Sequence, residues 1–245
     1  MKAISTRLLV ALITFSLGVV VAAVWMMQRV PQQSIDPVDL QRVVQIQPPV
    51  VATACFPGVG VKLTAAVHAK GAYFPQGAFF QDTLLDQSFA NAYTRRLKQM
   101  TESSLWFLPD EVPYGVYRFV WLRSFHSPVV VRIWIDADKR MLTVKELSRV
   151  IESGSSPLQV ERTRSLTPDE WQTFTRLVDT SCFWGMKSTF DDPIAEDGAW
   201  WVLEGAWDGH YHITHRQSPS DQSYRELCLY MLKLSGLPLN DSEIY

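Results

Sequence analysis

The stretch Trp200–Pro219, WWVLEGAWDGHYHITHRQSP, decides how the carboxyl-terminal part of the chain folds. An Asp-Gly pair between two alternating apolar segments is a strong signal for a β-hairpin. We therefore predict two antiparallel strands, Trp200–Ala206 and His210–Gln217. The same stretch holds three of the five histidines in the chain, so it is also the first place to look for a functional site.

Two registers of this hairpin compete. A two-residue loop would place Glu204 opposite Ile213, whereas a three-residue loop, Trp207–Gly209, would place Glu204 opposite His212. In the second register, Leu203 faces Ile213 on an apolar side of the hairpin. A sheet with one buried face favours the register that keeps its apolar side chains together, because a one-residue slip exchanges the faces. We predict the three-residue loop.

The predicted register places four polar or aromatic side chains, Glu204, His212, Arg216 and Trp200, on one face. A cross-strand pair of Glu204 and His212 can be structural, at about 0.2–1 kcal/mol. The same groups can also form a ligand-binding face, in which Arg216 is a natural contact for an anion. Our ligand-binding candidates are Glu204, His212, Arg216, Trp200 and Tyr211, and the sequence identifies no catalytic residue.

Enzymatic and metal-binding interpretations have weaker support. His210 and His212 share a face with Glu204, but strand alternation turns His215 to the other face. No HExxH helix supplies a further ligand, so we predict neither a metal site nor a cofactor. A carboxylate beside an imidazole suits general-base chemistry, and a hydrolase or metal-dependent enzyme using Glu204 and His212 is therefore kept as the alternative. The acidic loop DDPIAEDG lacks the spacing of a calcium-binding loop and is predicted to be solvated.

The rest of the chain between residues 61 and 245 alternates strand and helix signals. Thr167, Pro168 and Glu170 form the signature of a helix start. The predicted helices are Asp86–Glu102, Thr167–Trp184 and Ser220–Leu237, and the other predicted strands are Val116–Phe125, Val129–Asp136, Met141–Leu147 and Leu158–Leu166. Runs of antiparallel strands flanked by helices indicate an α+β fold, an antiparallel β-sheet packed with about three helices.

The amino-terminal sequence indicates a membrane anchor. Leu8–Met27 contains no charged residue, and twenty helical residues span about 30 Å of hydrocarbon. Lys2 and Arg7 precede this run, which favours an amino terminus in the cytoplasm. We predict a signal anchor with a transmembrane helix at residues 1–29, with a cleaved signal as the alternative. A Pro- and Gln-rich linker at residues 30–60 and a single extracytoplasmic α+β domain at residues 61–245 follow.

The three cysteines, Cys55, Cys182 and Cys228, form no complete disulfide framework. None has the CxxC spacing of zinc ribbons or redox motifs. Cys182 and Cys228 could pair if two helices meet, but we expect each to be a buried thiol. The net charge of -2 provides no basic field, so we predict no nucleic-acid partner.

The carboxyl-terminal half, residues 117–237, resembles a family of uncharacterised bacterial proteins that are membrane-anchored or secreted. The matching segments are YRFVWLRSFHSPVVVRI, LTPDEW, CFW, DGAWWVLEGAWDGHYHITHRQSP and SYRELCLYMLKLSGL. The pattern is DGxxWxxE…GxYHxxxRxSP, formed here by Asp197, Gly198, Trp201, Glu204, Gly209, Tyr211, His212, Arg216, Ser218 and Pro219. The resemblance implies no stated activity, but it supports treating Glu204, His212 and Arg216 as a unit.

Together these features predict a single-pass protein of the bacterial inner membrane with its domain in the periplasm. We expect a non-enzymatic module that binds a protein or a small anionic ligand.

Overall fold

The computed structural model describes residue 55 and residues 61–62, 72–106, 115–136, 138–148, 157–189, 194–207 and 210–245. The predicted anchor lies outside the described residues, as does the predicted linker apart from Cys55. Within those ranges, none of the helices combines the length and the apolar composition that a membrane span requires.

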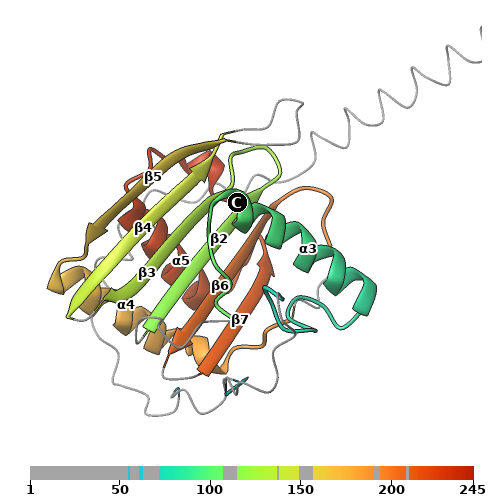
Figure 1. The fold of residues 1–245 in the computed structure, drawn as a ribbon, viewed down its shortest axis with the longest axis horizontal. Helices are drawn as coiled ribbons and strands as arrows, with labels where there is room; N and C mark the ends of the chain where they lie inside the picture. The colour runs from blue at the N-terminus through green and yellow to red at the C-terminus, as the bar shows by residue number, and fades with distance from the viewer. Residues whose placement is uncertain are drawn as a thin grey trace, which may run out of the picture. The chain divides into compact units, whose positions relative to one another are not determined.

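The domain is built on one antiparallel sheet with the strand order β1-β7-β6-β2-β3-β4-β5 (Figure 1). β2, β3, β4 and β5 follow one another as a meander, and the β6–β7 hairpin then adds to β2. β1 is a two-residue strand on the outer edge of β7. The strands are β1 Val61–Lys62, β2 Gly115–Arg123, β3 Val129–Asp136, β4 Lys139–Leu147, β5 Leu158–Ser165, β6 Ala199–Trp207 and β7 His210–Gln217.

Helices cover both faces of this sheet. In Figure 1, α3 (Thr83–Gln99) lies in front of the sheet, and α4 (Pro168–Thr180) and α5 (Gln222–Ser235) lie behind it. The predicted α+β class, an antiparallel sheet with three helices, is therefore confirmed. We call the two sides of the sheet the front face and the back face.

The alternation along Val116–Phe125 predicts that Tyr117, Phe119, Trp121 and Phe125 share one face of the sheet. The first three enter the back core, whereas Phe125 is exposed. Tyr117, Phe119 and Trp121 alternate along β2 and point together toward α4 and α5. The predicted capping box of α4 is present, with the Thr167 side chain accepting a hydrogen bond from the Glu170 backbone and the Glu170 side chain bound to the Thr167 backbone. α5 ends at Gly236, whose positive φ of 60° suits glycine.

The front core lies between α3 and part of the sheet. The spacing of Phe89, Tyr93, Leu97 and Met100 predicts one apolar stripe on this helix. Tyr93, Leu97 and Met100, the last at the C-cap of α3, are buried, and Phe89 is partly buried against the same core. Their partners on the strands are Val116, Val120, Val130, Leu147, Val202, Ala206, Tyr211 and Ile213. Most of these partners come from β2, β6 and β7, so α3 leaves much of the front face of β3, β4 and β5 without helical cover.

The predicted register of the hairpin is wrong. Glu204 lies opposite Ile213, and Gly205 lies opposite His212, which is the register of a two-residue connection between Trp207 and His210. The prediction assumed a sheet with one buried face. Because helices cover both faces, apolar side chains are needed on both, and the alternation argument loses its force.

The prediction for the cysteines needs a correction as well. Cys55 and Cys182 form a disulfide across 127 residues, whereas Cys228 is a buried free thiol on α5. The possible pairing of Cys182 with Cys228 and the buried thiol expected at Cys182 are therefore wrong, whereas the buried thiol expected at Cys228 is confirmed. The sequence places Cys55 in a predicted linker, where no packing argument identifies it as a partner of Cys182.

Candidate functional site

A buried ion pair occupies the centre of the front face. The Arg118 side chain on β2 lies opposite Glu204 on β6, and Arg118 Nε donates a hydrogen bond of 2.8 Å to Glu204 Oε2. Arg118 Nη2 lies 2.7 Å from the same oxygen, and both side chains are completely buried. The Tyr211 hydroxyl donates to Glu204 Oε1 at 2.9 Å. Both carboxylate oxygens of Glu204 are thus bonded to other side chains of the protein.

The ion pair belongs to a longer row of polar side chains across the sheet. Glu102, which follows α3, places its carboxylate 3.6 Å from Arg118 Nη1, 3.2 Å from Arg132 Nε and 3.0 Å from Lys145 Nζ. Lys145 Nζ also lies 3.4 Å from Glu161 on β5. We call this set the polar row: Tyr211, Glu204, Arg118, Glu102, Arg132, Lys145 and Glu161. It runs from the buried interior to solvent.

Burial and charge act against each other inside the polar row. Burial raises the pKa of Glu204, and the ion pair and hydrogen bonds from Arg118 oppose that rise. Burial also raises the pKa of Tyr211 well above its usual range, and the neighbouring Glu204 carboxylate adds to the shift. Tyr211 is therefore a neutral donor that helps to hold a buried carboxylate.

His212 and Arg216 lie on the back face, away from Glu204. The His212 ring packs against Phe183 at 5.0 Å and Trp184 at 6.2 Å between ring centroids. Gly205 makes room for these rings, because a Cβ at this position would lie 2.7 Å from Phe183. The prediction that Glu204, His212 and Arg216 act as a unit on one face is wrong, because the register turns His212 and Arg216 to the opposite side of the sheet.

Arg216 is occupied by backbone carbonyl groups. Its Nη2 donates to the Lys187 carbonyl at 2.7 Å, and its Nη1 donates to the carbonyl of His215 at 2.8 Å. Its guanidinium also lies 5.8 Å from the centre of the Tyr224 ring. These contacts hold the segment that precedes β6 against β7. The role of Arg216 is therefore structural.

Trp200 belongs to an aromatic cluster around His215 on the front face. The Trp200 and His215 rings stack with centroids 4.5 Å apart, and a hydrogen bond of 3.0 Å joins His215 Nε2 to the Tyr93 hydroxyl. The other rings around His215 are those of Phe79, Phe80 and Phe89. Of the five candidates from the sequence, the structure joins only Glu204 and Tyr211 directly.

We expect the two buried histidines to make the fold sensitive to acid. Burial lowers the pKa of His212 to about 4 and that of His215 to about 3, from an ordinary value near 6.5. Between pH 6.5 and those values, the unfolded chain binds protons that the folded chain excludes, so stability falls as the pH falls. Each histidine contributes a slope of up to about 1.4 kcal/mol per pH unit.

Urea unfolding at pH 7.0, 6.0 and 5.0 measures this slope. The His212→Phe variant should lose about half of it, because His215 alone then titrates in the window. An unchanged slope in that variant would show that folding does not lower the pKa of His212.

Charged residues that sequence reasoning missed build most of the polar row. Arg118, Arg132 and Lys145 each interrupt an apolar strand, and Arg118 and Arg132 lie directly opposite each other. A charged residue inside an apolar strand whose two faces are both covered must find a partner, and this was the available signal. Within the described residues, no group of three His, Cys, Asp or Glu side chains is placed to hold a metal ion.

Comparison with known proteins yields no relative: no family model, no curated protein and no solved structure matches this chain.

Proposed function

We propose that this chain is a membrane-anchored protein of the bacterial envelope whose extracytoplasmic domain binds a partner without catalysing a reaction. The uncharged run Leu8–Met27 supports the anchor. The disulfide between Cys55 and Cys182 supports an oxidising compartment such as the periplasm, because such bonds are rare in the cytosol.

The enzyme alternative depended on Glu204 and His212 acting together. The two side chains lie on opposite faces of the sheet, and each is packed under other groups. A general base must lie within hydrogen-bond reach of the group that it serves, and buried Glu204 already serves Arg118 and Tyr211. We therefore do not propose a hydrolase or a metal-dependent enzyme.

The observation that carries the proposed binding function is the part of the front face that α3 does not cover. Strand register places Arg132, Thr143 and Thr163 in one row and Trp134, Met141 and Ser165 in the next. Thr163 and Ser165 are exposed, and Arg132, Trp134 and Met141 are half-buried. We call these five accessible residues the open patch: Arg132, Trp134, Met141, Thr163 and Ser165.

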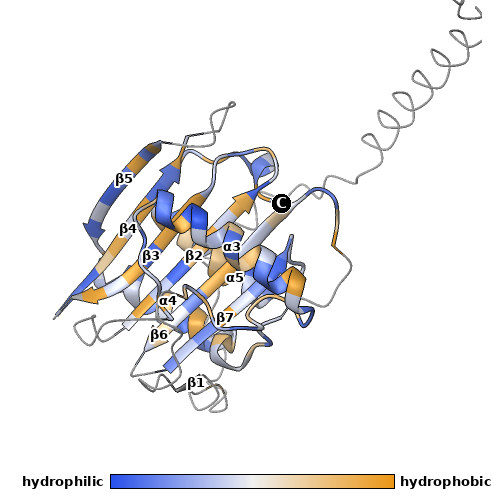
Figure 2. Cartoon of the chain, turned by 45° about the vertical axis from the view of Figure 1, so that its right-hand side comes forward, coloured by the Kyte–Doolittle hydropathy of each residue, from blue (hydrophilic) through white to orange (hydrophobic). Residues whose placement is uncertain are grey.

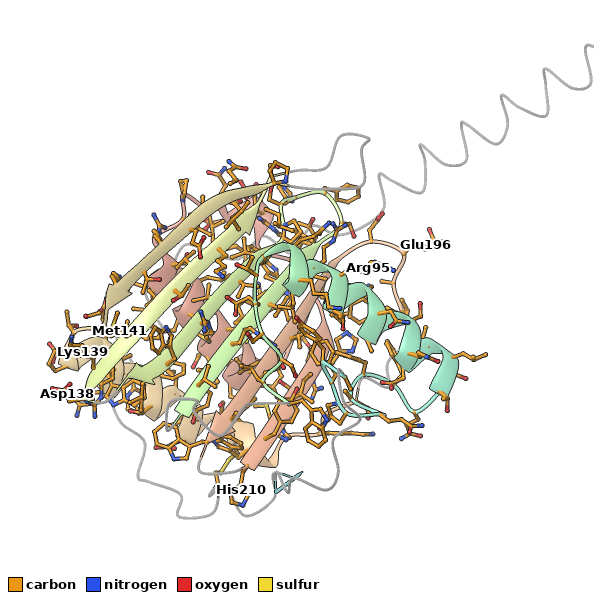
Figure 3. All side chains as sticks on the ribbon, in the orientation of Figure 1. Arg95, Asp138, Lys139, Met141, Glu196 and His210 are labelled. Carbon is orange, nitrogen blue, oxygen red and sulfur yellow. A yellow bond between two sulfur atoms is a disulfide. The ribbon has the colours of Figure 1, made fainter. Side chains whose placement is uncertain are left out.

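The open patch mixes one charged, two apolar and two hydroxyl side chains on a rigid sheet. Figure 2 shows both hydrophobic and hydrophilic residues along β5, and Figure 3 places Met141 on the part of the sheet away from Arg95 of α3. Aromatic residues, Met and Arg are enriched where proteins bind partners. This composition makes the open patch the best candidate surface for a partner.

Site-specific photo-crosslinking in living cells tests this function. A photoreactive residue in place of Thr163 should give a discrete crosslinked product, whereas the same residue in place of exposed Gln172, on α4 of the opposite face, should not. Both variants must reach the membrane fraction in equal amounts. Equal products at the two positions, or no product at Thr163, would contradict the proposed binding surface.

A further inference from the structure

Arg132 differs from the other cations of the polar row in how its charge is balanced. Arg118 forms ion pairs with Glu204 and Glu102, and Lys145 forms ion pairs with Glu161 and Glu102. The ion pair of Arg132 is with Glu102 alone, through Nε at 3.2 Å. One buried carboxylate therefore serves three cations, and Arg132 has no second carboxylate among the described residues.

The outer edge of the Arg132 guanidinium is accessible. The ion pair engages Nε, on the inner side of the group, while the side chain keeps 29% of its exposure. The described residues provide no hydrogen bond or ion pair to its two terminal amino groups. A guanidinium held at Nε presents those groups as a fork, the geometry that receives both oxygens of a carboxylate.

Trp134 forms an apolar wall beside this fork. The Arg132 guanidinium lies 5.8 Å from the centre of the Trp134 ring. The ring is fixed, because Trp134 Nε1 donates a hydrogen bond of 3.1 Å to Thr143 Oγ1, and the Thr143 hydroxyl is bonded in turn to Thr163 at 3.0 Å. The fork and the wall both stand on β3, so little conformational freedom is lost when a ligand binds.

We propose that Arg132 and Trp134 form a subsite for a carboxylate of an acidic peptide, an inference that rests on the proposed binding function. The fork pairs with both carboxylate oxygens, and the Trp134 ring covers the adjoining methylene groups of the ligand. The nearby carboxylates of Glu102 and half-exposed Glu161 disfavour a doubly charged phosphate more than a singly charged carboxylate. The ligand chemistry is therefore an acidic side chain or a chain terminus.

Nuclear magnetic resonance on the full-length protein in detergent micelles tests this subsite. The probe is N-acetyl-glutamate amide, which carries one carboxylate, and the control probe is N-acetyl-glutamine amide. The acidic probe should shift the Arg132 Nε–H and Trp134 Nε1–H signals in a saturable way, with a Kd on the order of millimolar for a single ion pair. The neutral probe should cause no such shift.

Three variants separate the fork from general charge and from misfolding. Arg132→Gln should abolish the response of Trp134 to the acidic probe, and Arg132→Lys, which keeps the charge but loses the fork, should weaken it about tenfold. Arg140→Gln is the matched control, because Arg140 lies 5.7 Å from the ring of Trp171 on the opposite side of the sheet. This control should bind the probe as the parent protein does.

An equal response to the neutral probe, retained binding in Arg132→Gln, or tighter binding of inorganic phosphate would overturn the carboxylate subsite. The two proposals fail in different ways. Crosslinking at Thr163 without any response to the acidic probe would remove the subsite and leave the binding function. A saturable response to the acidic probe without crosslinking at Thr163 would remove the proposed binding function and leave the carboxylate subsite.

Discussion

Replacing Arg118 by Met is expected to lower the free energy of unfolding by about 3–5 kcal/mol. The substitution would leave the Glu204 carboxylate completely buried and without its ionic partner. It would also remove the donor to the Ser103 carbonyl, which Arg118 Nη1 contacts at 2.5 Å. Urea denaturation of the purified protein, followed by tryptophan fluorescence, measures the loss.

Two controls show whether the uncompensated charge is the cause. Arg95→Met removes an exposed arginine of α3 and should change stability by less than about 0.5 kcal/mol. The double variant Arg118→Met/Glu204→Leu should recover much of the loss, because neither charge then stays buried alone. A loss below about 1 kcal/mol in Arg118→Met would contradict a fully buried ion pair.

Breaking the disulfide is expected to have the second large effect. The bond between Cys55 and Cys182 closes a loop with a sequence separation of 127, and such long loops restrict the unfolded chain strongly. Cys55→Ser should lower the free energy of unfolding by about 2–5 kcal/mol, and addition of a reductant to the parent protein should have a similar effect.

Cys228→Ala is the matched control, because Cys228 is a buried free thiol. The Cys228→Ala protein should keep its dependence on the reductant, whereas Cys55→Ser should lose it. Alkylation under native conditions should modify no cysteine of the parent protein, since burial raises the pKa of the Cys228 thiol far above neutrality and shields it from reagents. Stability that does not respond to reductant would exclude the disulfide.

Much of the fold follows from local patterns. The alternation in β2 predicts which residues enter the back core, and Thr167, Pro168 and Glu170 predict the start of α4. These signals depend on neighbours in the sequence, and neighbours are what a single sequence shows. The buried stripe of α3 is predicted for the same reason.

The hairpin register could not be predicted in this way, because it depends on what covers each face of the sheet. If only one face were buried, the pairing of Glu204 with His212 would keep the polar groups together. α3 covers this part of the front face, and Arg118, on a strand 86 residues earlier in the chain, supplies the partner of Glu204. Neither fact is visible within Trp200–Pro219.

The open patch was missed for a related reason. Arg132 and Trp134 both belong to the predicted strand Val129–Asp136, and nothing nearby in the sequence indicates that α3 does not cover them. Their exposure follows from the order of strands in the sheet, which sets them away from β6 and β7. The exposure of such residues can be identified only from the three-dimensional arrangement of the helices over the sheet.

We infer that the polar groups of the β6–β7 hairpin hold the fold together and do not form a reactive pair. Double-mutant cycles on stability test it most directly, using Glu204→Leu with Arg118→Met and Glu204→Leu with His212→Phe. The first cycle should give a coupling free energy of about 2–3 kcal/mol, and the second a value within about 0.5 kcal/mol of zero. A coupling of 1 kcal/mol or more between Glu204 and His212, with little between Glu204 and Arg118, would contradict the account.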